Sequence, residues 1–69
     1  MKLQEETLVY FKQERHFKID VNGKEIWVSK WVEQDGEFYQ MDGDIEIFKG
    51  KELLSEDEIE EVLEFVEDL

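Results

Sequence analysis

The clearest pattern of apolar and polar positions lies in the last seventeen residues, Leu53 to Leu69. Apolar residues recur there at the spacing of one buried helical face, without an interrupting glycine or proline. These residues are Ile59, Val62, Leu63 and Val66, with Phe65 and Leu69 near the edge of the stripe. Ser55 and Glu58 form a capping-box pattern, in which each side chain accepts a hydrogen bond from the other residue's amide. The pattern predicts a helix over residues 56–68.

The other side of this predicted helix is wholly acidic. Its charged residues are Glu56, Asp57, Glu58, Glu60, Glu61, Glu64, Glu67 and Asp68. Like charges four residues apart cost about 0.2 to 0.5 kcal/mol per pair, and Glu67 and Asp68 oppose the helix dipole. Nothing within the helix offsets these costs. We therefore expect burial against another element to hold the helix, and we expect its last turn to fray.

Upstream of the helix, apolar and polar residues alternate, as in strands with one buried face. Three turn signals divide this region, namely Asn22-Gly23, Gln34-Asp35-Gly36 and Asp42-Gly43. The strands between them are expected over residues 16–21, 25–33, 37–41 and 44–48. The apolar run at residues 7–11 is either a further strand or a helical turn, so the structure of residues 1–14 stays open.

The first hairpin has two alternative registers. A two-residue loop pairs Ile19 with Ile26, but it places like charges opposite each other at two positions. The opposed pairs are Asp20 with Glu25 and Arg15 with Lys30. A four-residue loop pairs Val21 with Ile26 and avoids both conflicts. Either register leaves the same residues on each face of the sheet.

The two faces of the expected sheet differ in chemistry. One is mostly aliphatic and is formed by Phe17, Ile19, Val21, Ile26, Val28, Val32, Phe38, Ile45 and Ile47. The second face carries His16, Lys18, Trp27, Ser29, Trp31, Tyr39, Met41 and Glu46. The sequence predicts an α+β fold with one domain over residues 1–69. An antiparallel β-meander of four to five strands occupies about residues 7–48, and the C-terminal helix packs on its aliphatic face.

Composition and charge restrict the function. Twenty acidic and eight basic residues give a net charge of −12, and residues 1–54 contribute only −4 of it. This sign argues against direct binding to nucleic acid or to anionic membranes. There are no cysteines, so disulfides and thiolate metal sites are excluded. We expect a cytoplasmic protein, because the N-terminus lacks a signal-peptide pattern and no segment is apolar enough to span a membrane.

The second face is one candidate interaction surface, through Trp27, Trp31, Tyr39 and Met41. Exposed aromatic and methionine side chains are typical of interfaces. Three alternatives stay open. The run Leu8–Phe11 covers these residues as a second small core, or two copies of the chain pair through them as a homodimer, or another protein binds there.

The acidic side of the helix is the other candidate. Its predicted partner-binding residues are Glu56, Asp57, Glu60, Glu61, Glu64, Glu67 and Asp68. The eight helical acids give about one charge per 2.8 Å of helix, close to the spacing of about 3.4 Å along one DNA strand. This density suggests a small protein-binding module, an inhibitor that mimics nucleic acid and engages a basic protein surface. An origin in a phage or mobile element would suit such a protein. The alternative is a solvated face that keeps a small protein soluble.

Catalytic and cofactor chemistry is weakly represented. His16 is the only histidine, which is too little for a transition-metal site. Asp42-Gly43-Asp44 and Glu46 lack the spacing of a calcium loop and are better explained as a hairpin. No glycine-rich phosphate loop and no nucleophile motif occurs. We expect a protein that is not an enzyme and binds no metal or cofactor.

Overall fold

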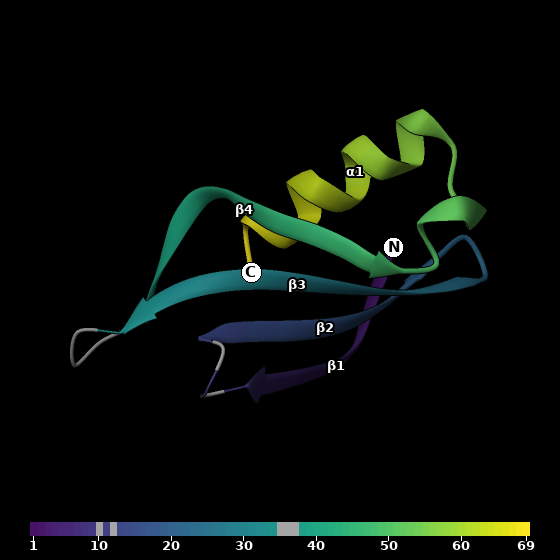
Figure 1. The fold of residues 1–69 in the computed structure, drawn as a ribbon. Coiled ribbons are helices and arrows are strands. Elements are labelled where there is room, and N and C mark those ends of the chain that lie inside the picture. Colours follow the sequence, from purple (N-terminus) through teal and green to yellow (C-terminus); the bar gives the residue numbers. More distant parts are fainter. Residues whose placement is uncertain (10, 12, 35–37) are drawn as a thin grey trace.

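A computed structural model of the chain describes residues 1–9, 11, 13–34 and 38–69, and the side chains of residues 32–44 lie outside the description. The elements are β1 (Lys2–Val9), β2 (Glu14–Val21), β3 (Lys24–Gln34), β4 (Phe38–Lys49), the short 3-10 helix η2 (Lys51–Leu53) and α1 (Glu56–Glu67). The strands form one antiparallel sheet in the order β1-β2-β3-β4 (Figure 1). The predicted α+β fold, a meander followed by one C-terminal helix, is therefore confirmed.

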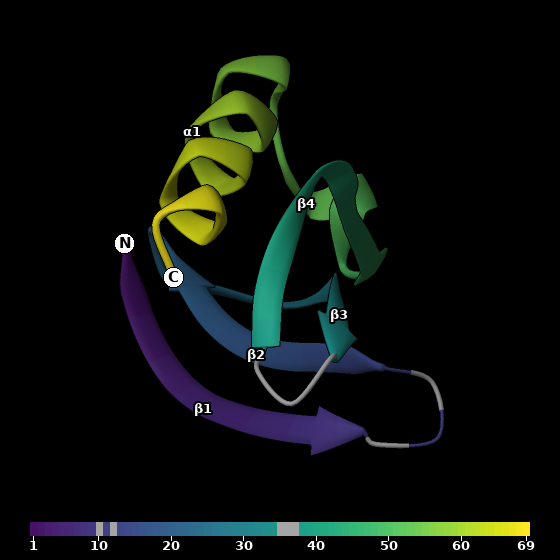
Figure 2. The same cartoon turned by 90° about the vertical axis from the view of Figure 1, so that its left-hand side faces the viewer.

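The core lies between α1 and one face of the sheet, and the strands curve beneath the helix (Figure 2). Its buried residues are Phe17, Ile19, Val21, Ile26, Val28, Ile47, Val62 and Val66. The six that come from the sheet all belong to the predicted aliphatic face. Alternation along β2 and β3 places them on the same side, because successive side chains of a strand point to opposite faces.

The N-terminal segment forms an edge strand, which resolves one of the open alternatives. β1 begins at Lys2, five residues before the apolar run that starts at Thr7, and it pairs with β2 along its length. Leu3 packs against the core, although its neighbours are polar. The pairing with β2 therefore extends the sheet through residues that carry little apolar signal. Tyr10 and Lys12, which follow β1, lie outside the described residues.

The first hairpin uses the two-residue loop. Asn22 and Gly23 have φ angles of 53° and 83°, as a type I′ turn requires. Ile19 therefore lies opposite Ile26. The conflict between Asp20 and Glu25 is relieved because each carboxylate has a different partner. The Gly23 amide donates to Asp20 Oδ1 at 3.0 Å, and Lys18 Nζ lies 3.3 Å from Glu25 Oε1.

The predicted hairpin at Asp42-Gly43 is wrong, because both residues lie inside the continuous strand β4. Residues on both sides of this pair bond to β3, with a register shift between the partners of Lys30 and Val32. A reversal at Gly43 would take residues 44–48 away from β3. Their pairing with β3 instead places Ile47 opposite Val28, where Ile47 joins the core. The turn predicted at residues 34–36 falls largely outside the described residues.

The buried stripe of α1 differs from the prediction at one position. Val62 and Val66 are fully buried, and Ile59, Phe65 and Leu69 pack against the core. Leu63 is 36% exposed, so its expected place in the buried stripe is wrong. The buried stripe runs in steps of three and four residues through Phe65 and Leu69. The helix is therefore rotated so that Leu63 faces solvent.

Candidate functional site

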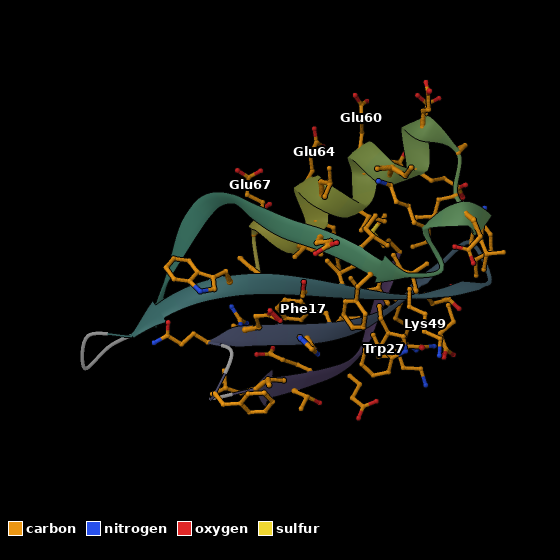
Figure 3. All side chains as sticks on the ribbon, viewed as in Figure 1. Phe17, Trp27, Lys49, Glu60, Glu64 and Glu67 are labelled. Carbon is orange, nitrogen blue, oxygen red and sulfur yellow. The ribbon has the colours of Figure 1, made fainter. Side chains whose placement is uncertain are left out.

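The seven acids predicted to bind a partner form a continuous exposed surface on α1. They are Glu56, Asp57, Glu60, Glu61, Glu64, Glu67 and Asp68, and we call this surface the acidic face. Figure 3 shows Glu60, Glu64 and Glu67 pointing away from the sheet. Within the described part of the chain, none of the ion pairs involves these seven carboxylates. The carboxylates of the acidic face are therefore exposed to solvent, and none of them forms an ion pair with a described base.

Glu58 is the one acid of the helix that the fold uses internally. Its side chain accepts the Ser55 amide at 2.9 Å and completes the predicted capping box. It also accepts hydrogen bonds from Lys24 Nζ at 2.6 Å and from Asn22 Nδ2 at 2.9 Å. These bonds, with that from Lys24 the strongest influence, lower the pKa of Glu58 to about 2. The first turn of α1 is therefore tied to the β2–β3 hairpin.

The last turn of α1 is tied to the sheet by two bases. Lys30 is fully buried, and its Nζ donates to the carbonyl oxygens of Val66 at 2.8 Å and Glu67 at 3.2 Å. Arg15 Nη1 donates to the carbonyl oxygen of Leu69 at 2.9 Å. Cations at this end of a helix also face the negative end of its dipole. The sheet thus supplies the bases whose absence from the helix suggested a frayed last turn.

The opposition of Arg15 and Lys30 across β2 and β3 therefore has a structural purpose. Burial lowers the pKa of Lys30, and the neighbouring charge of Arg15 lowers it further. Glu67, Asp68 and Glu6 act in the opposite direction and favour the charged lysine. Arg15 Nε also lies 3.0 Å from Glu6 Oε2 on β1. Both bases are thus oriented toward groups that compensate their charge.

The predicted aromatic surface is brought together only in part. Trp27 and Trp31 are partly buried on β3, whereas the side chains of Tyr39 and Met41 lie outside the described residues. Lys18 Nζ lies 5.9 Å from the centre of the Trp27 ring, a cation–π distance. Leu8–Val9 cannot form the second layer that would cover this face, because these residues belong to the sheet itself.

Phe48 is the residue that the sequence reasoning missed on this face. Its ring centre lies 4.9 Å from that of His16 and 6.3 Å from that of Trp27, and its side chain is 47% exposed. The register of β3 and β4 shifts beside it, between Trp27 and Val28. Simple alternation could have found Phe48, because it lies two residues after Glu46, which was assigned to this face.

Other kinds of site find little support. Among the residues that the structure describes, no group of three or more histidine or carboxylate side chains could hold a metal ion. In the same residues, no helix is long and apolar enough to cross a membrane. A scan against protein-family models and searches of curated proteins and solved structures found no match to this chain. Its own geometry must therefore carry any functional argument.

Proposed function

We propose that this protein binds the basic surface of another protein through its acidic face. The observation that carries this proposal is the difference between the two sides of α1: bases of the sheet bond to its inner side, whereas the carboxylates on its outer side are exposed. Lys24 and Lys30 bond to α1 from the side of the sheet, and Arg15 bonds to Leu69 just beyond it. None of these three bases forms an ion pair with the acidic face. Seven neighbouring carboxylates on one side of α1 thus remain exposed and available to a partner.

The charge density favours a partner that otherwise binds nucleic acid. Seven carboxylates over residues 56–68 span about 18 Å of helix, or about one charge per 2.6 Å. This lies between the spacing of about 3.4 Å along one DNA strand and about 1.7 Å for the duplex. A groove lined with lysine and arginine for a phosphate backbone therefore suits the acidic face. Occupation of such a groove would make this protein an inhibitor.

The attachment of α1 supports binding as well. The helix is bonded to the sheet at its first turn through Glu58 and at its last turn through the carbonyl oxygens of Val66 and Glu67. Val62 and Val66 fill the core between these ends. Little conformational freedom of the backbone remains to be lost on binding, which favours affinity. The complementary potentials also accelerate the encounter with a basic partner.

The test is affinity capture from a lysate at low and high salt, followed by titration of the captured protein. The variant carries Glu60→Lys and Glu64→Lys, and the control carries Glu46→Lys and Glu52→Lys at exposed positions away from the acidic face. Both variants change the net charge from −12 to −8. We expect the first to bind at least about tenfold more weakly and the control to bind nearly as well as the wild type.

Two further results bear on the partner. Binding should weaken steeply as salt rises, because exposed charges are screened over about 8 to 10 Å. Duplex DNA should displace this protein from the partner if both occupy one basic groove. Equal loss of binding in the two double variants would show that only net charge matters, and it would refute a specific role for the acidic face.

A further inference from the structure

The face of the sheet opposite α1 carries a second interaction surface. We call Trp27, Phe48 and His16 the aromatic patch. We propose that two copies of this chain form a dimer through the aromatic patch, with the two acidic helices on the outside. Figure 3 shows Trp27 on one side of the sheet and Glu60, Glu64 and Glu67 on the other. The dimer would therefore leave both acidic faces accessible.

The patch is assembled but not enclosed. Phe48 lies against both His16 and Trp27, yet nearly half of its side chain remains exposed. Phe11, which was expected to help cover this face, is 86% exposed. Aromatic side chains gain most from burial at the centre of an interface. Phe48 is thus placed as the group that a partner would bury.

The distribution of charge selects a second copy as that partner. A chain with a net charge of −12 repels its own copies, and the repulsion is largest if two acidic faces meet. The opposite face of the sheet carries charges of both signs, such as Lys18 beside Glu25 at 3.3 Å. A surface with both signs can be complementary to itself across a two-fold axis. A strongly basic partner would instead choose the acidic face.

The size of this face sets the expected strength of the dimer. The molecule extends 36 × 20 × 17 Å, so one face offers roughly 600 to 700 Å² and a pair of faces roughly 1,200 to 1,400 Å². Stable interfaces bury about 1,200 to 2,000 Å² in total. The curvature seen in Figure 2 turns the outer face away from a flat contact and reduces the usable area. We therefore expect a weak dimer that dissociates in the micromolar range.

The experiment is sedimentation equilibrium of the wild type, Phe48→Glu and Phe11→Glu over concentrations from about 5 µM to 1 mM. The two variants remove the same side chain and add the same charge, but only one lies in the aromatic patch. We expect Phe48→Glu to weaken the dimer at least about tenfold and Phe11→Glu to leave it nearly unchanged. Thr7→Glu, at an exposed position paired with His16, should weaken it as well without altering the core.

Salt separates this proposal from the one for the acidic face. Higher salt screens the repulsion between two −12 chains, so the dimer should tighten while binding of a basic partner weakens. A wild type that stays monomeric at 1 mM in high salt would overturn the dimer. A dimer that persists in both Phe48→Glu and Thr7→Glu, or is lost equally in Phe11→Glu, would do so too. None of these results depends on Glu60 or Glu64.

Discussion

Replacement of Lys30 by methionine is the sharpest test of how the fold holds the acidic helix. Lys30 is fully buried and donates to the carbonyl oxygens of Val66 and Glu67. Methionine keeps an unbranched apolar chain of similar length and removes only the charged donor. The substitution therefore separates the hydrogen bonds to the helix from the packing of the lysine stem.

The expected loss follows from the groups left behind. The Val66 carbonyl keeps the Leu69 amide at 3.0 Å, whereas the Glu67 carbonyl loses its donor. Hydrogen bonds to charged groups contribute about 1.5 to 3 kcal/mol. Relief from burying an ammonium group offsets part of this. We expect Lys30→Met to destabilise the fold by about 1 to 3 kcal/mol, and Lys30→Ala by about 2 kcal/mol more because it leaves a cavity.

Urea unfolding and amide hydrogen exchange measure the two aspects of this prediction. The free energy of unfolding should fall as stated, and each kcal/mol corresponds to about 4 to 8 °C in Tm for a domain of this size. Exchange should accelerate most in the last turn of α1, near Val66, and least near the capping box at Ser55. Unchanged exchange in the last turn, together with wild-type stability, would refute the role assigned to Lys30.

The pH dependence provides an independent control. Burial holds the pKa of Lys30 in the folded state below its usual value of 10.5. The unfolded chain therefore binds more protons between the lowered pKa and 10.5, and stability from this group rises with pH across that interval. Lys30→Met lacks this contribution. The difference in stability between wild type and Lys30→Met should be constant at pH values well below the lowered pKa and should grow as the pH approaches 10.5.

Three other perturbations test the remaining features of the fold. Glu58→Gln should lower the free energy of unfolding at neutral pH. Because the pKa of Glu58 is depressed to about 2, the loss measured by urea unfolding should be complete above pH 4.5 and should vanish as the pH falls toward 2. Gly50→Ala should cost about 1 to 3 kcal/mol by thermal unfolding, because Gly50 has φ 88° and an added Cβ would lie 3.0 Å from the Glu25 carbonyl oxygen. Val62→Ala should lower the free energy of unfolding by about 2 to 3 kcal/mol, and Leu63→Ala should lower it by less than about 1 kcal/mol. A larger loss for Leu63→Ala than for Val62→Ala in urea unfolding would contradict the observed rotation of α1.

Local signals explain what could be predicted from the sequence. The capping box at Ser55 and the apolar spacing that follows it indicate the helix start and its buried side within a few residues. Asn22-Gly23 indicates the first hairpin because both residues tolerate positive φ. These features depend on neighbours in the chain, so periodicity and turn chemistry suffice to find them. The exposed position of the acidic face follows from the same helical period.

Features that depend on tertiary contacts were harder to predict. Asp42-Gly43 has the composition of a hairpin turn, yet pairing with β3 of the residues on both sides keeps the pair inside β4. The opposed Arg15 and Lys30 left the register of the first hairpin open, because their conflict is relieved only by carbonyl acceptors at the C-terminal end of the chain, Leu69 for Arg15 and Val66 for Lys30. Neither the pairing with β3 nor the carbonyl acceptors at the end of the helix can be recognised from the neighbouring residues in the sequence. The choice between strand and turn at Asp42-Gly43 therefore depends on the pairing with β3. The choice between the two registers of the first hairpin depends on the position of the helix.

The contacts of Lys30 and Arg15 at the end of the helix also bear on function. A sheet that met the helix with carboxylate-pairing bases would neutralise α1 and leave no acidic surface for a basic partner. The sheet instead bonds mainly to backbone carbonyl oxygens and to the Glu58 side chain. It thereby fixes both ends of the helix and leaves the carboxylates of the acidic face exposed. Stability and external charge are thereby separated within one twelve-residue helix. This separation is what makes the charge-reversal experiment at Glu60 and Glu64 informative, because those substitutions relieve repulsion within α1 and should leave the fold intact.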